Sequence, residues 1–183
     1  MRVKVCGVTR PADARLAARL GAWAVGLIFV PGTPRFLTLA QARRVRAAIP
    51  KGVLAVGVFR RPAPGTLALY RKELRLDGVQ DGGKLRIGSR RLALIEPRRT
   101  DADRRAGRTP SEAARRRAWK KAASSRRAAV LAGGLTPENA AQAAAARPYA
   151  LDVSSGVERR LGVKDARLLR AFFAAVRGGP KIR

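Results

Sequence analysis

An apolar stretch at residues 149–156 leads into side chains that could bind a small anionic molecule. It reads as a short buried strand with a carboxylate, Asp152, near its end, followed by a small polar turn. The turn supplies two hydroxyl groups and one flexible backbone position, from Ser154, Ser155 and Gly156. A strand that ends in such a turn can present backbone N–H groups to a phosphate.

A second stretch, at residues 129–134, has the same form and runs from an apolar strand into Gly133 and Gly134. Thr136 and Pro137 follow, with the residue types expected of a helix N-cap and a first helical position. In a parallel barrel the last two strand-to-helix loops are the usual phosphate grip. We therefore interpret the protein as an enzyme that holds a phosphorylated small molecule. The alternative is that both stretches are ordinary tight turns of an α/β protein.

The chain contains no histidine and a single cysteine, Cys6. This excludes Ser–His and Cys–His catalysis, His-based metal sites, Cys-based zinc sites and an intramolecular disulfide. Proton transfer must therefore use Asp, Glu, Lys, Tyr or the lone thiol. Cys6 ends the first expected strand, residues 2–6, so this strand delivers a thiol at its carboxyl end.

The 183 residues carry 40 Lys and Arg against 12 Asp and Glu, a net charge of +28. Such a field attracts polyanions and steers anionic substrates. Specific nucleic-acid binding should add interleaved aromatic residues or a recognition helix, and the Arg-rich runs have neither. We expect no specific nucleic acid and no membrane as partners. The lack of a signal-peptide pattern and the cysteine usage favour the cytoplasm.

The spacing of apolar residues predicts strands that alternate with helices, which implies a parallel sheet with right-handed crossovers. The expected strands are residues 2–6, 24–30, 53–59, 77–80, 129–132 and 149–153, and the expected helices are 11–20, 38–48, 64–74, 137–146 and 164–177. The best fit is a single α/β domain over residues 1–183, a (β/α) TIM-type barrel.

Six separate motifs in this order resemble the phosphoribosylanthranilate isomerases of tryptophan biosynthesis. They are Lys4-Val-Cys-Gly-Val-Thr-Arg10, Gly26-Leu-Ile-Phe-Val-Pro-Gly-Thr-Pro-Arg35, Val56-Gly-Val-Phe59, Leu131-Ala-Gly-Gly-Leu135, Leu151-Asp-Val-Ser-Ser-Gly-Val-Glu158 and Gly162-Val-Lys-Asp165. The resemblance covers about residues 1–80 and 128–176. It implies an intramolecular aldose–ketose isomerase that works without a metal or organic cofactor. The implied reaction is an Amadori rearrangement of N-(5-phosphoribosyl)anthranilate, with the enzyme as a monomer or homodimer.

The resemblance also implies roles for individual residues. Cys6 falls on the general base, and the basic surroundings are expected to favour its thiolate. Arg35 falls on the arginine that meets the anthranilate end, and Asp152 falls on a carboxylate that orients the substrate. The phosphate grip falls on Gly133, Gly134, Ser154, Ser155 and Gly156. From residue type alone, Cys6 is more often a small buried hydrophobe at a strand end. The alternative for Arg35 is a solvated loop charge, and that for Asp152 is an N-cap or turn residue.

The middle of the chain departs from this pattern. The family's Gln-Leu-His-Gly turn is replaced by Gln80-Asp-Gly-Gly83, and 11 residues separate Gln80 from Leu92. A parallel crossover needs about a dozen residues. We therefore expect the loss of about one βα module between residues 80 and 92, with a barrel that closes with seven strands or keeps an open edge. Glu96 then falls on the family's catalytic aspartate, the general acid.

Residues 97–127 form an Arg-rich divergent segment within the domain, with a helix expected from Ser111 to Ala123 and Trp119 as a core anchor. The shortened middle leaves two other hypotheses open. One is an impaired barrel that binds phosphorylated ligands without turnover. The other is a basic nucleic-acid-binding remnant, which would show a steep salt dependence and little base preference.

Overall fold

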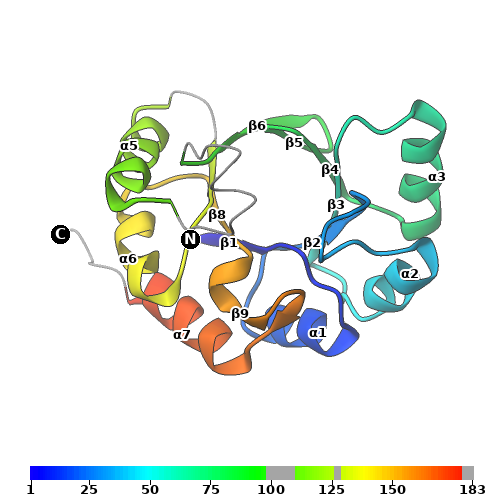
Figure 1. Ribbon diagram of the computed structural model, residues 1–183, viewed down its shortest axis with the longest axis horizontal. Helices are drawn as coiled ribbons and strands as arrows, with labels where there is room; N and C mark the ends of the chain where they lie inside the picture. The colour runs from blue at the N-terminus through cyan, green and yellow to red at the C-terminus, as the bar shows by residue number, and fades with distance from the viewer. Residues whose placement is uncertain (98–109, 126–128, 179–183) are drawn as a thin grey trace.

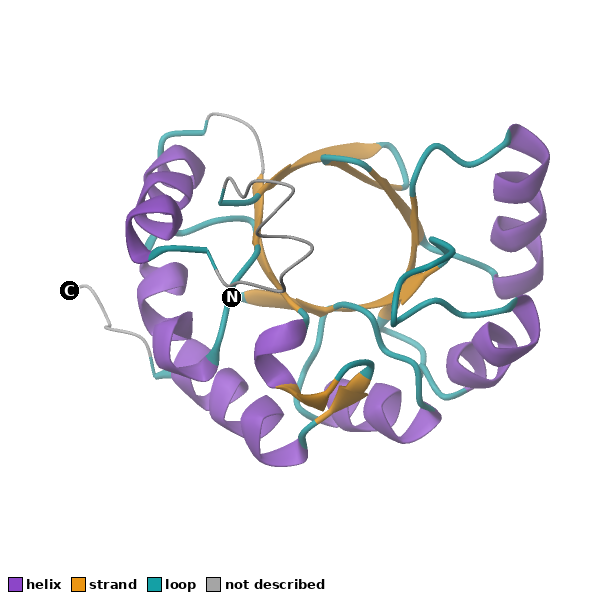
Figure 2. Cartoon of the chain, viewed as in Figure 1, coloured by secondary structure: helices purple, strands orange, loops and turns teal. Residues whose placement is uncertain are grey.

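A computed structural model of the chain describes residues 1–97, 110–125 and 129–178. Its centre is a closed barrel of eight strands in the order β1 to β8 (Figures 1 and 2), which confirms the expected fold class. The strands are β1 (Arg2–Val5), β2 (Ala24–Ile28), β3 (Leu54–Phe59), β4 (Gly78–Asp81), β5 (Lys84–Ile87), β6 (Arg90–Ile95), β7 (Ala129–Ala132) and β8 (Ala150–Val153).

Helices lie outside this barrel and cover most of its circumference (Figure 1). They are α1 (Pro11–Arg19), α2 (Leu39–Ala47), α3 (Pro64–Leu74), α5 (Glu112–Ala123), α6 (Pro137–Ala145) and α7 (Ala166–Arg177). Pro11, Pro64 and Pro137 each occupy the first turn of a helix, where a missing N–H costs nothing. The larger apolar core fills the layer between strands and helices, and a smaller one fills the barrel itself.

The alternation of side chains along the strands separates these two cores. In β1, Val3 and Val5 face the helices, whereas Lys4 is fully buried and bonded to partners inside the barrel. In β8, Leu151 and Val153 face outward while Ala150 packs in the inner core. Polar residues at the inner positions of the carboxyl half are therefore directed toward one mouth of the barrel.

The region between β4 and β6 differs from the sequence expectation. The barrel closes with eight strands, because β5 lies between β4 and β6 and pairs with both in antiparallel fashion. Two-residue turns connect them, and Gly82 and Gly88 have positive φ values of 55° and 56°. A hairpin turn needs about two residues, whereas a parallel crossover needs about a dozen. The chain has thus kept the strand and lost the helical crossovers on either side of it.

The outer face of this hairpin has no helix over it among the described residues (Figure 1). Arg86 pairs in register with Val79 and Arg91, so this outward row carries two arginines. A hollow of about 690 Å³ lies beside it, lined in part by Arg71 of α3 and by Lys84. Positive charge on an uncovered sheet face opposes pairing with a second sheet, so the lost helices left a surface suited to solvent.

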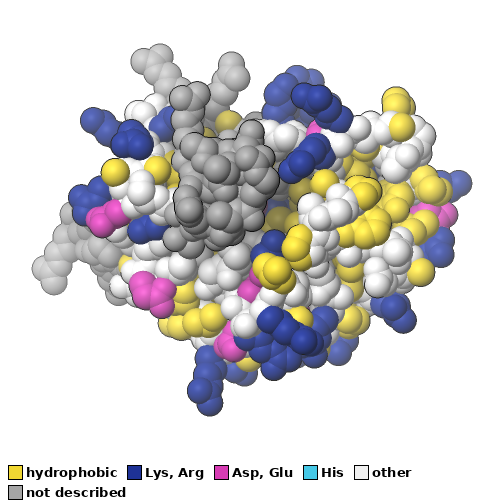
Figure 3. All heavy atoms as spheres, in the orientation of Figure 1, with side chains coloured by type: hydrophobic (Ala, Val, Ile, Leu, Met, Phe, Trp, Pro, Cys, Tyr) yellow, Lys and Arg dark blue, Asp and Glu magenta, His cyan; other side chains and the backbone are white. Residues whose placement is uncertain are grey.

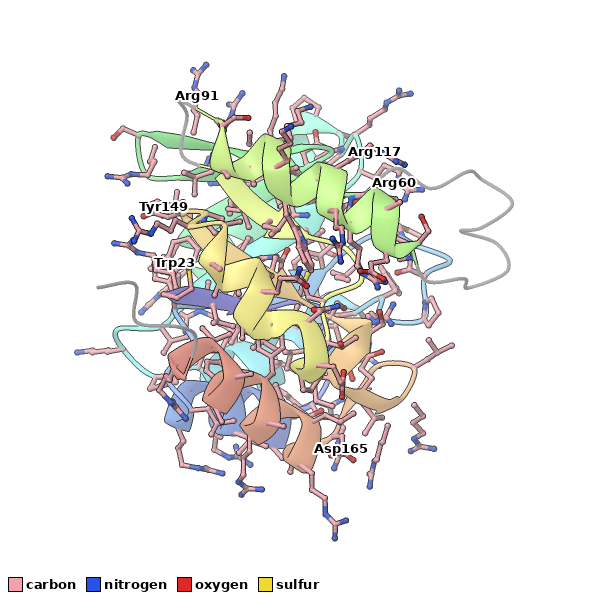
Figure 4. The ribbon with its side chains drawn as sticks, turned by 90° about the vertical axis from the view of Figure 1, so that its left-hand side faces the viewer. Trp23, Arg60, Arg91, Arg117, Tyr149 and Asp165 are labelled. Carbon is pink, nitrogen blue, oxygen red and sulfur yellow. The ribbon has the colours of Figure 1, made fainter. Side chains whose placement is uncertain are left out.

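Other expectations can be compared directly. Helix α5 begins after the N-cap Ser111 and buries Trp119, as predicted. The polar residues 98–109 of the Arg-rich segment lie outside the described residues. Helix α7 begins at Ala166 and not at Lys164, because Asp165 is its N-cap (Figure 4) and Lys164 belongs to a short hairpin. That hairpin consists of β9 (Glu158–Arg160) and β10 (Val163–Lys164), after the short helix η1 (Ser155–Val157).

The amino end of the barrel is closed by an aromatic cluster. Trp23 and Tyr149 meet edge to face with ring centroids 5.6 Å apart, and Figure 4 shows them together at one end of the molecule, with Arg60 toward the other. The guanidinium groups of Arg2 and Arg90 lie 4.4 Å and 5.1 Å from the Tyr149 ring centroid. The carboxyl ends of the parallel strands lie at the opposite end of the barrel, where catalytic residues of this fold are usually found. No helix in the described ranges has the length and apolarity to span a membrane.

Candidate active site

Cys6 directly follows β1 at the carboxyl mouth of the barrel, with 8% of its surface exposed. Its backbone N–H donates to Val153 O at the end of β8. The neighbouring strand has Gly26 beside it, and a Cβ built there would lie 2.8 Å from the Cys6 Sγ. Real Cβ atoms do not approach sulfur so closely. Gly26 therefore provides the space that the thiol occupies.

A buried hydrogen-bonded network lies beneath the thiol. The Lys4 Nζ donates to Asp152 Oδ2 at 2.7 Å and to Gln80 Oε1 at 3.0 Å, across the barrel from β8 to β4. Burial lowers the pKa of Lys4, but the charges of Asp152 and Cys6 outweigh it, so the pKa is raised overall and the ammonium stays protonated. Removing one partner of such a pair would leave a buried charge without compensation, which would strongly destabilise the folded protein.

The electrostatics of Cys6 differ from the sequence expectation. Burial raises the pKa of the thiol, and the positive charges of Lys4 and Lys164 only partly offset that effect. Burial therefore affects the protonation of Cys6 more strongly than the neighbouring lysines do. The basic surroundings do favour the thiolate, as expected, since both lysines lower the pKa of Cys6, but that expectation left out desolvation, which is the larger effect and raises the pKa overall.

Asp152 has one engaged and one free oxygen. Oδ2 accepts from Lys4, whereas Oδ1 is buried and has no hydrogen-bond partner among the described residues. An unsatisfied buried carboxylate oxygen is costly unless a ligand completes its bonding. The turn-residue interpretation of Asp152 is thereby replaced by a buried carboxylate at the floor of the site.

Arg35 reaches the site from the loop between β2 and α2. Its Nε and Nη2 donate to the two carboxylate oxygens of Glu158 at 2.8 Å and 2.6 Å. The same carboxylate accepts from Lys164 Nζ at 2.8 Å. This makes Arg35 a fixed group and not a solvated loop charge, and only 17% of its side chain is exposed.

Burial would raise the pKa of Glu158, but the hydrogen bonds and charges of Arg35 and Lys164 lower it below its ordinary value. The Glu158 bond raises the pKa of Arg35. The pKa of Lys164 is lowered, chiefly by burial. One carboxylate thus serves two cations, which leaves a net positive charge beside Cys6.

The two Gly/Ser loops meet at this mouth. The Ser154 hydroxyl donates to Cys6 O at 3.1 Å, while Ser155 begins the short helix η1. Gly133 and Gly134 adopt positive φ values of 82° and 72°, as a tight turn before α6 requires. The structure therefore brings the predicted phosphate residues to the same barrel end as Cys6, Arg35 and Asp152.

Gly156 allows the two loops to touch, because a Cβ at this position would overlap Leu135 O. We expect Gly156→Ala to destabilise the protein by about 1–3 kcal/mol through overpacking and to raise KM for a phosphorylated substrate. Thermal unfolding and steady-state kinetics would measure both effects. Gly65→Ala in α3 is the matched control, since nothing lies within 4 Å of its added Cβ. A Gly156→Ala protein as stable as Gly65→Ala would contradict the prediction.

Glu96 immediately follows β6 and shares the register of Leu92 and Leu94, which pack in the inner core. The residue is exposed at the barrel rim. A Cβ built on Gly133 would lie 3.5 Å from the Glu96 Cβ, so Glu96 flanks the loop that contains Gly133 and Gly134. Glu96 is thus at the same mouth as Cys6, and no described residue hydrogen-bonds to its carboxylate.

Four polar residues of the site were not identified from the sequence, namely Lys4, Gln80, Glu158 and Lys164. Lys4 could have been found from its two-residue spacing to Cys6, which places both side chains on one strand face. The others are brought in from β4 and from the β9–β10 hairpin, and no local pattern reveals those contacts. In the described part of the chain, no group of three or more His, Cys, Asp and Glu residues is placed to hold a metal ion.

Comparison with known proteins gives one consistent result. A family profile described as N-(5'-phosphoribosyl)anthranilate (PRA) isomerase matches residues 116–175. The N-(5'-phosphoribosyl)anthranilate isomerase of Halorhodospira halophila is 35% identical over 201 aligned positions, which cover 97% of each chain. That of Pseudomonas aeruginosa (strain UCBPP-PA14) is 36% identical and covers 97% of this chain and 95% of its own.

Solved structures agree with these sequence relatives. The phosphoribosyl anthranilate isomerase of Thermus thermophilus is 33% identical, with a TM-score of 0.77 over 97% of this chain and 98% of its own. That of Thermotoga maritima is 29% identical, with a TM-score of 0.79 over 97% and 99%. A structure of the enzyme in complex with reduced 1-(o-carboxyphenylamino)-1-deoxyribulose 5-phosphate has a TM-score of 0.78 and 29% identity over the same fractions.

Proposed function

This chain belongs to the N-(5'-phosphoribosyl)anthranilate isomerase family, and we propose that Cys6 and Glu96 are the base and the acid with which it works. It is an isomerase of tryptophan biosynthesis that converts N-(5-phosphoribosyl)anthranilate to 1-(2-carboxyphenylamino)-1-deoxyribulose 5-phosphate. The observation that supports the residue roles is the position of Cys6. Its thiol occupies the space over Gly26, at the barrel mouth shared with Asp152 and both Gly/Ser loops.

Binding divides the substrate between the two sides of the mouth. The phosphate is held by the loops that contain Gly133, Gly134, Ser154, Ser155 and Gly156. The anthranilate carboxylate meets the free edge of the Arg35 guanidinium, because a planar cation with several donors suits a carboxylate. The buried Asp152 Oδ1 accepts a hydrogen bond from the sugar or the amine between these ends. A related enzyme binds a reduced product with the same two charged ends.

In the first chemical step, the Glu96 carboxyl donates a proton to the furanose ring oxygen. The bond between that oxygen and C1 breaks, and the ring opens to a Schiff base between C1 and the anthranilate nitrogen. Developing positive charge on this nitrogen makes the C2 proton more acidic. The acid must be protonated before this step, so Glu96 regains a proton in every cycle.

In the second step, the Cys6 thiolate removes the proton from C2 and gives an enolamine, which tautomerises to the ketone. A buried thiolate needs compensating charge, and three cations supply it, from Lys4, Arg35 and Lys164. The positively charged Schiff base adds to them at the moment when the base is needed. This balances the desolvation that disfavours the thiolate in the free protein.

We further propose that the enzyme acts in the cytoplasm as a monomer or homodimer. The relatives include a dimeric enzyme from Thermotoga maritima of which monomeric forms have been made. Lys and Arg side chains are scattered over the face shown in Figure 3, and a positive field of this kind suits an anionic substrate. A surface this basic also binds polyanions weakly, without specific nucleic-acid recognition.

Turnover is tested by generating the phosphoribosylated anthranilate in situ and following the loss of its fluorescence on isomerisation. Wild-type protein is expected to consume the substrate at a rate proportional to enzyme concentration. Folded protein that binds the phosphorylated product but shows no turnover would support the impaired-barrel alternative. Tight, base-selective nucleic-acid binding would support the other alternative.

The protonation of Cys6 gives a prediction with a definite sign. Because burial raises the thiol pKa above the ordinary value of about 8.5, alkylation by iodoacetamide should be slow at neutral pH and rise about tenfold per pH unit until that pKa is passed. Cys6 is the only cysteine, so incorporated label reports this site alone. N-acetylcysteine in the same buffers is the reference. A rate plateau below neutral pH would show that the cations outweigh burial.

A further inference from the structure

The β9–β10 hairpin carries two charged side chains that the proposed reaction leaves without a direct role. Glu158 opens β9 and Lys164 closes β10. Their side chains are 3% and 0% exposed, so both charges are removed from solvent. Buried charges are costly unless they are paired and hydrogen-bonded, and here they pair with each other and with Arg35.

We propose that Glu158 is the positioning residue of the active site, which holds Arg35 in the orientation that receives the anthranilate carboxylate. This inference rests on the proposed function and adds a residue to it. Glu158 does not contact the reacting atoms. It acts through the guanidinium group that does contact the substrate.

The first argument is that, among the described residues, Glu158 alone hydrogen-bonds to the Arg35 side chain. The residue lies in the long loop between β2 and α2, and a long flexible side chain loses about 2 kcal/mol of rotamer entropy when it is fixed. Its only hydrogen bonds to described residues are the two parallel bonds to Glu158. A bidentate bond of this kind fixes the plane of the guanidinium as well as its position.

The second argument concerns the edge of the Arg35 guanidinium that remains free to bind a ligand. Glu158 occupies Nε and Nη2, so Nη1 makes no hydrogen bond within the described residues. The stem of the side chain crosses directly over Gly7, where an added Cβ would overlap Arg35 Cδ. The guanidinium is therefore held next to Cys6, with one pair of donors available to a ligand carboxylate.

The third argument is the connection to the phosphate side. Lys164 Nζ bonds both to Glu158 Oε1 at 2.8 Å and to Ser154 O at 3.1 Å. The Lys164 backbone N–H donates to the buried Asp13 of α1 at 3.1 Å, which fixes the hairpin to the barrel. Contacts therefore run without a break from Arg35 to Glu158, from Glu158 to Lys164 and from Lys164 to Ser154. They join the two loops that, in the proposed function, hold the two ends of the substrate.

The test is a double-mutant cycle on Arg35→Ala and Glu158→Gln. If Glu158 acts through Arg35, each single variant should raise KM by about 10- to 100-fold, the size of a lost charged hydrogen bond. The double variant should then be within about twofold of Arg35→Ala. The effect of Glu158→Gln should fall mainly on KM and much less on kcat, because Glu158 acts through the guanidinium that binds the substrate. Wild-type KM in Glu158→Gln, or KM factors that multiply in the double variant, would overturn the proposal.

Two controls separate positioning from folding. Glu73→Gln removes the same charge from the exposed pair that Glu73 makes with Arg43, and its KM should match that of the wild type. Arg35→Lys keeps the charge but cannot form two parallel bonds, so it should raise KM like Arg35→Ala even if Glu158→Gln does not fold. A wild-type KM in Arg35→Lys would contradict the proposal.

A binding measurement separates this inference from the proposed catalytic roles. The Kd of the product, 1-(2-carboxyphenylamino)-1-deoxyribulose 5-phosphate, can be measured calorimetrically on a Cys6→Ala background. Adding Glu158→Gln should raise this Kd by the same factor as KM, whether or not the unmodified enzyme uses Cys6. An unchanged Kd would reject the positioning role of Glu158 while leaving the assignment of Cys6 intact.

Discussion

Replacing Cys6 with alanine is expected to lower kcat by about 10²- to 10⁴-fold, the usual contribution of a positioned general base. The thiol is the one titratable group that follows β1 at the mouth, and Gly26 leaves the space for it. The change removes one buried sulfur and leaves the Lys4–Asp152 pair in place. The melting temperature should therefore change little, and the fluorescence assay measures the loss of turnover.

Cys6→Ser is the closest control, because it keeps the size of the side chain and replaces the thiol with a hydroxyl that does not ionise near neutral pH. It should be as inactive as Cys6→Ala. Iodoacetamide should inactivate the wild type and leave the residual rate of Cys6→Ala unchanged. A serine variant with near wild-type turnover would show that another group removes the C2 proton.

Most strands and helices of the barrel could be predicted because short stretches of sequence determine them. Continuous apolar runs gave β2 and β3, and Thr38 and Ser111 marked helix starts that the structure confirms by hydrogen bonds to Gln41 N and Ala114 N. The two Gly/Ser loops could be located because Gly133 directly follows β7 and Ser154 directly follows β8. These are signals that a short window of sequence contains.

Strand β5 was not predicted, because it belongs to a β-hairpin and the sequence prediction considered only parallel strands joined by crossovers. Residues 84–87 are flanked by the turn residues Gly82, Gly83 and Gly88, which is a hairpin pattern. An expectation of parallel crossovers made the interval look too short for any strand. Two reversals of direction restore the parallel pairing of β6 with β7, so an antiparallel β5 closes the barrel without a helix on either side.

Only the site residues at or near the ends of strands could be predicted from the sequence. Cys6 and Ser154 directly follow strands and Asp152 lies near the end of one, whereas the partner of Arg35 comes from a hairpin more than a hundred residues away. The raised pKa of Cys6 likewise depends on burial, which local composition does not give. A count of positive charges indicated a thiolate, but desolvation determines the direction of the shift.

The shortened middle leaves the chemical end of the barrel intact for a geometric reason. Turn residues 82 and 83 lie at the end of β4 that faces the carboxyl mouth, whereas turn residues 88 and 89 lie at the amino end of the barrel. Gln80 still reaches Lys4 across the barrel, and β6 still delivers Glu96 to the rim next to Gly133. The lost helices lay outside the barrel, where they would have covered the row that now contains Arg86 and Arg91.

Glu96→Gln is expected to lower kcat by about 10²- to 10⁴-fold, because the amide cannot donate the proton that opens the furanose ring. Glu96→Asp keeps a carboxyl group one methylene shorter and should retain more activity than Glu96→Gln, although a displacement of about 1 Å can cost about 100-fold. Glu112→Gln is the matched control, since it makes the same change in an exposed pair with Arg116 on α5. Steady-state kinetics of the three variants would rank them.

A Glu96→Gln protein within about tenfold of the wild type would move the acid role elsewhere in the mouth. Asp152 would then be the group to test, because its Oδ1 is buried without a partner in the described chain while Oδ2 is held by Lys4. Asp152→Asn would abolish turnover in that case, but it would also disturb the buried lysine. The stability of Asp152→Asn would therefore have to be measured alongside its kcat, and only a folded, inactive protein would transfer the role from Glu96 to Asp152.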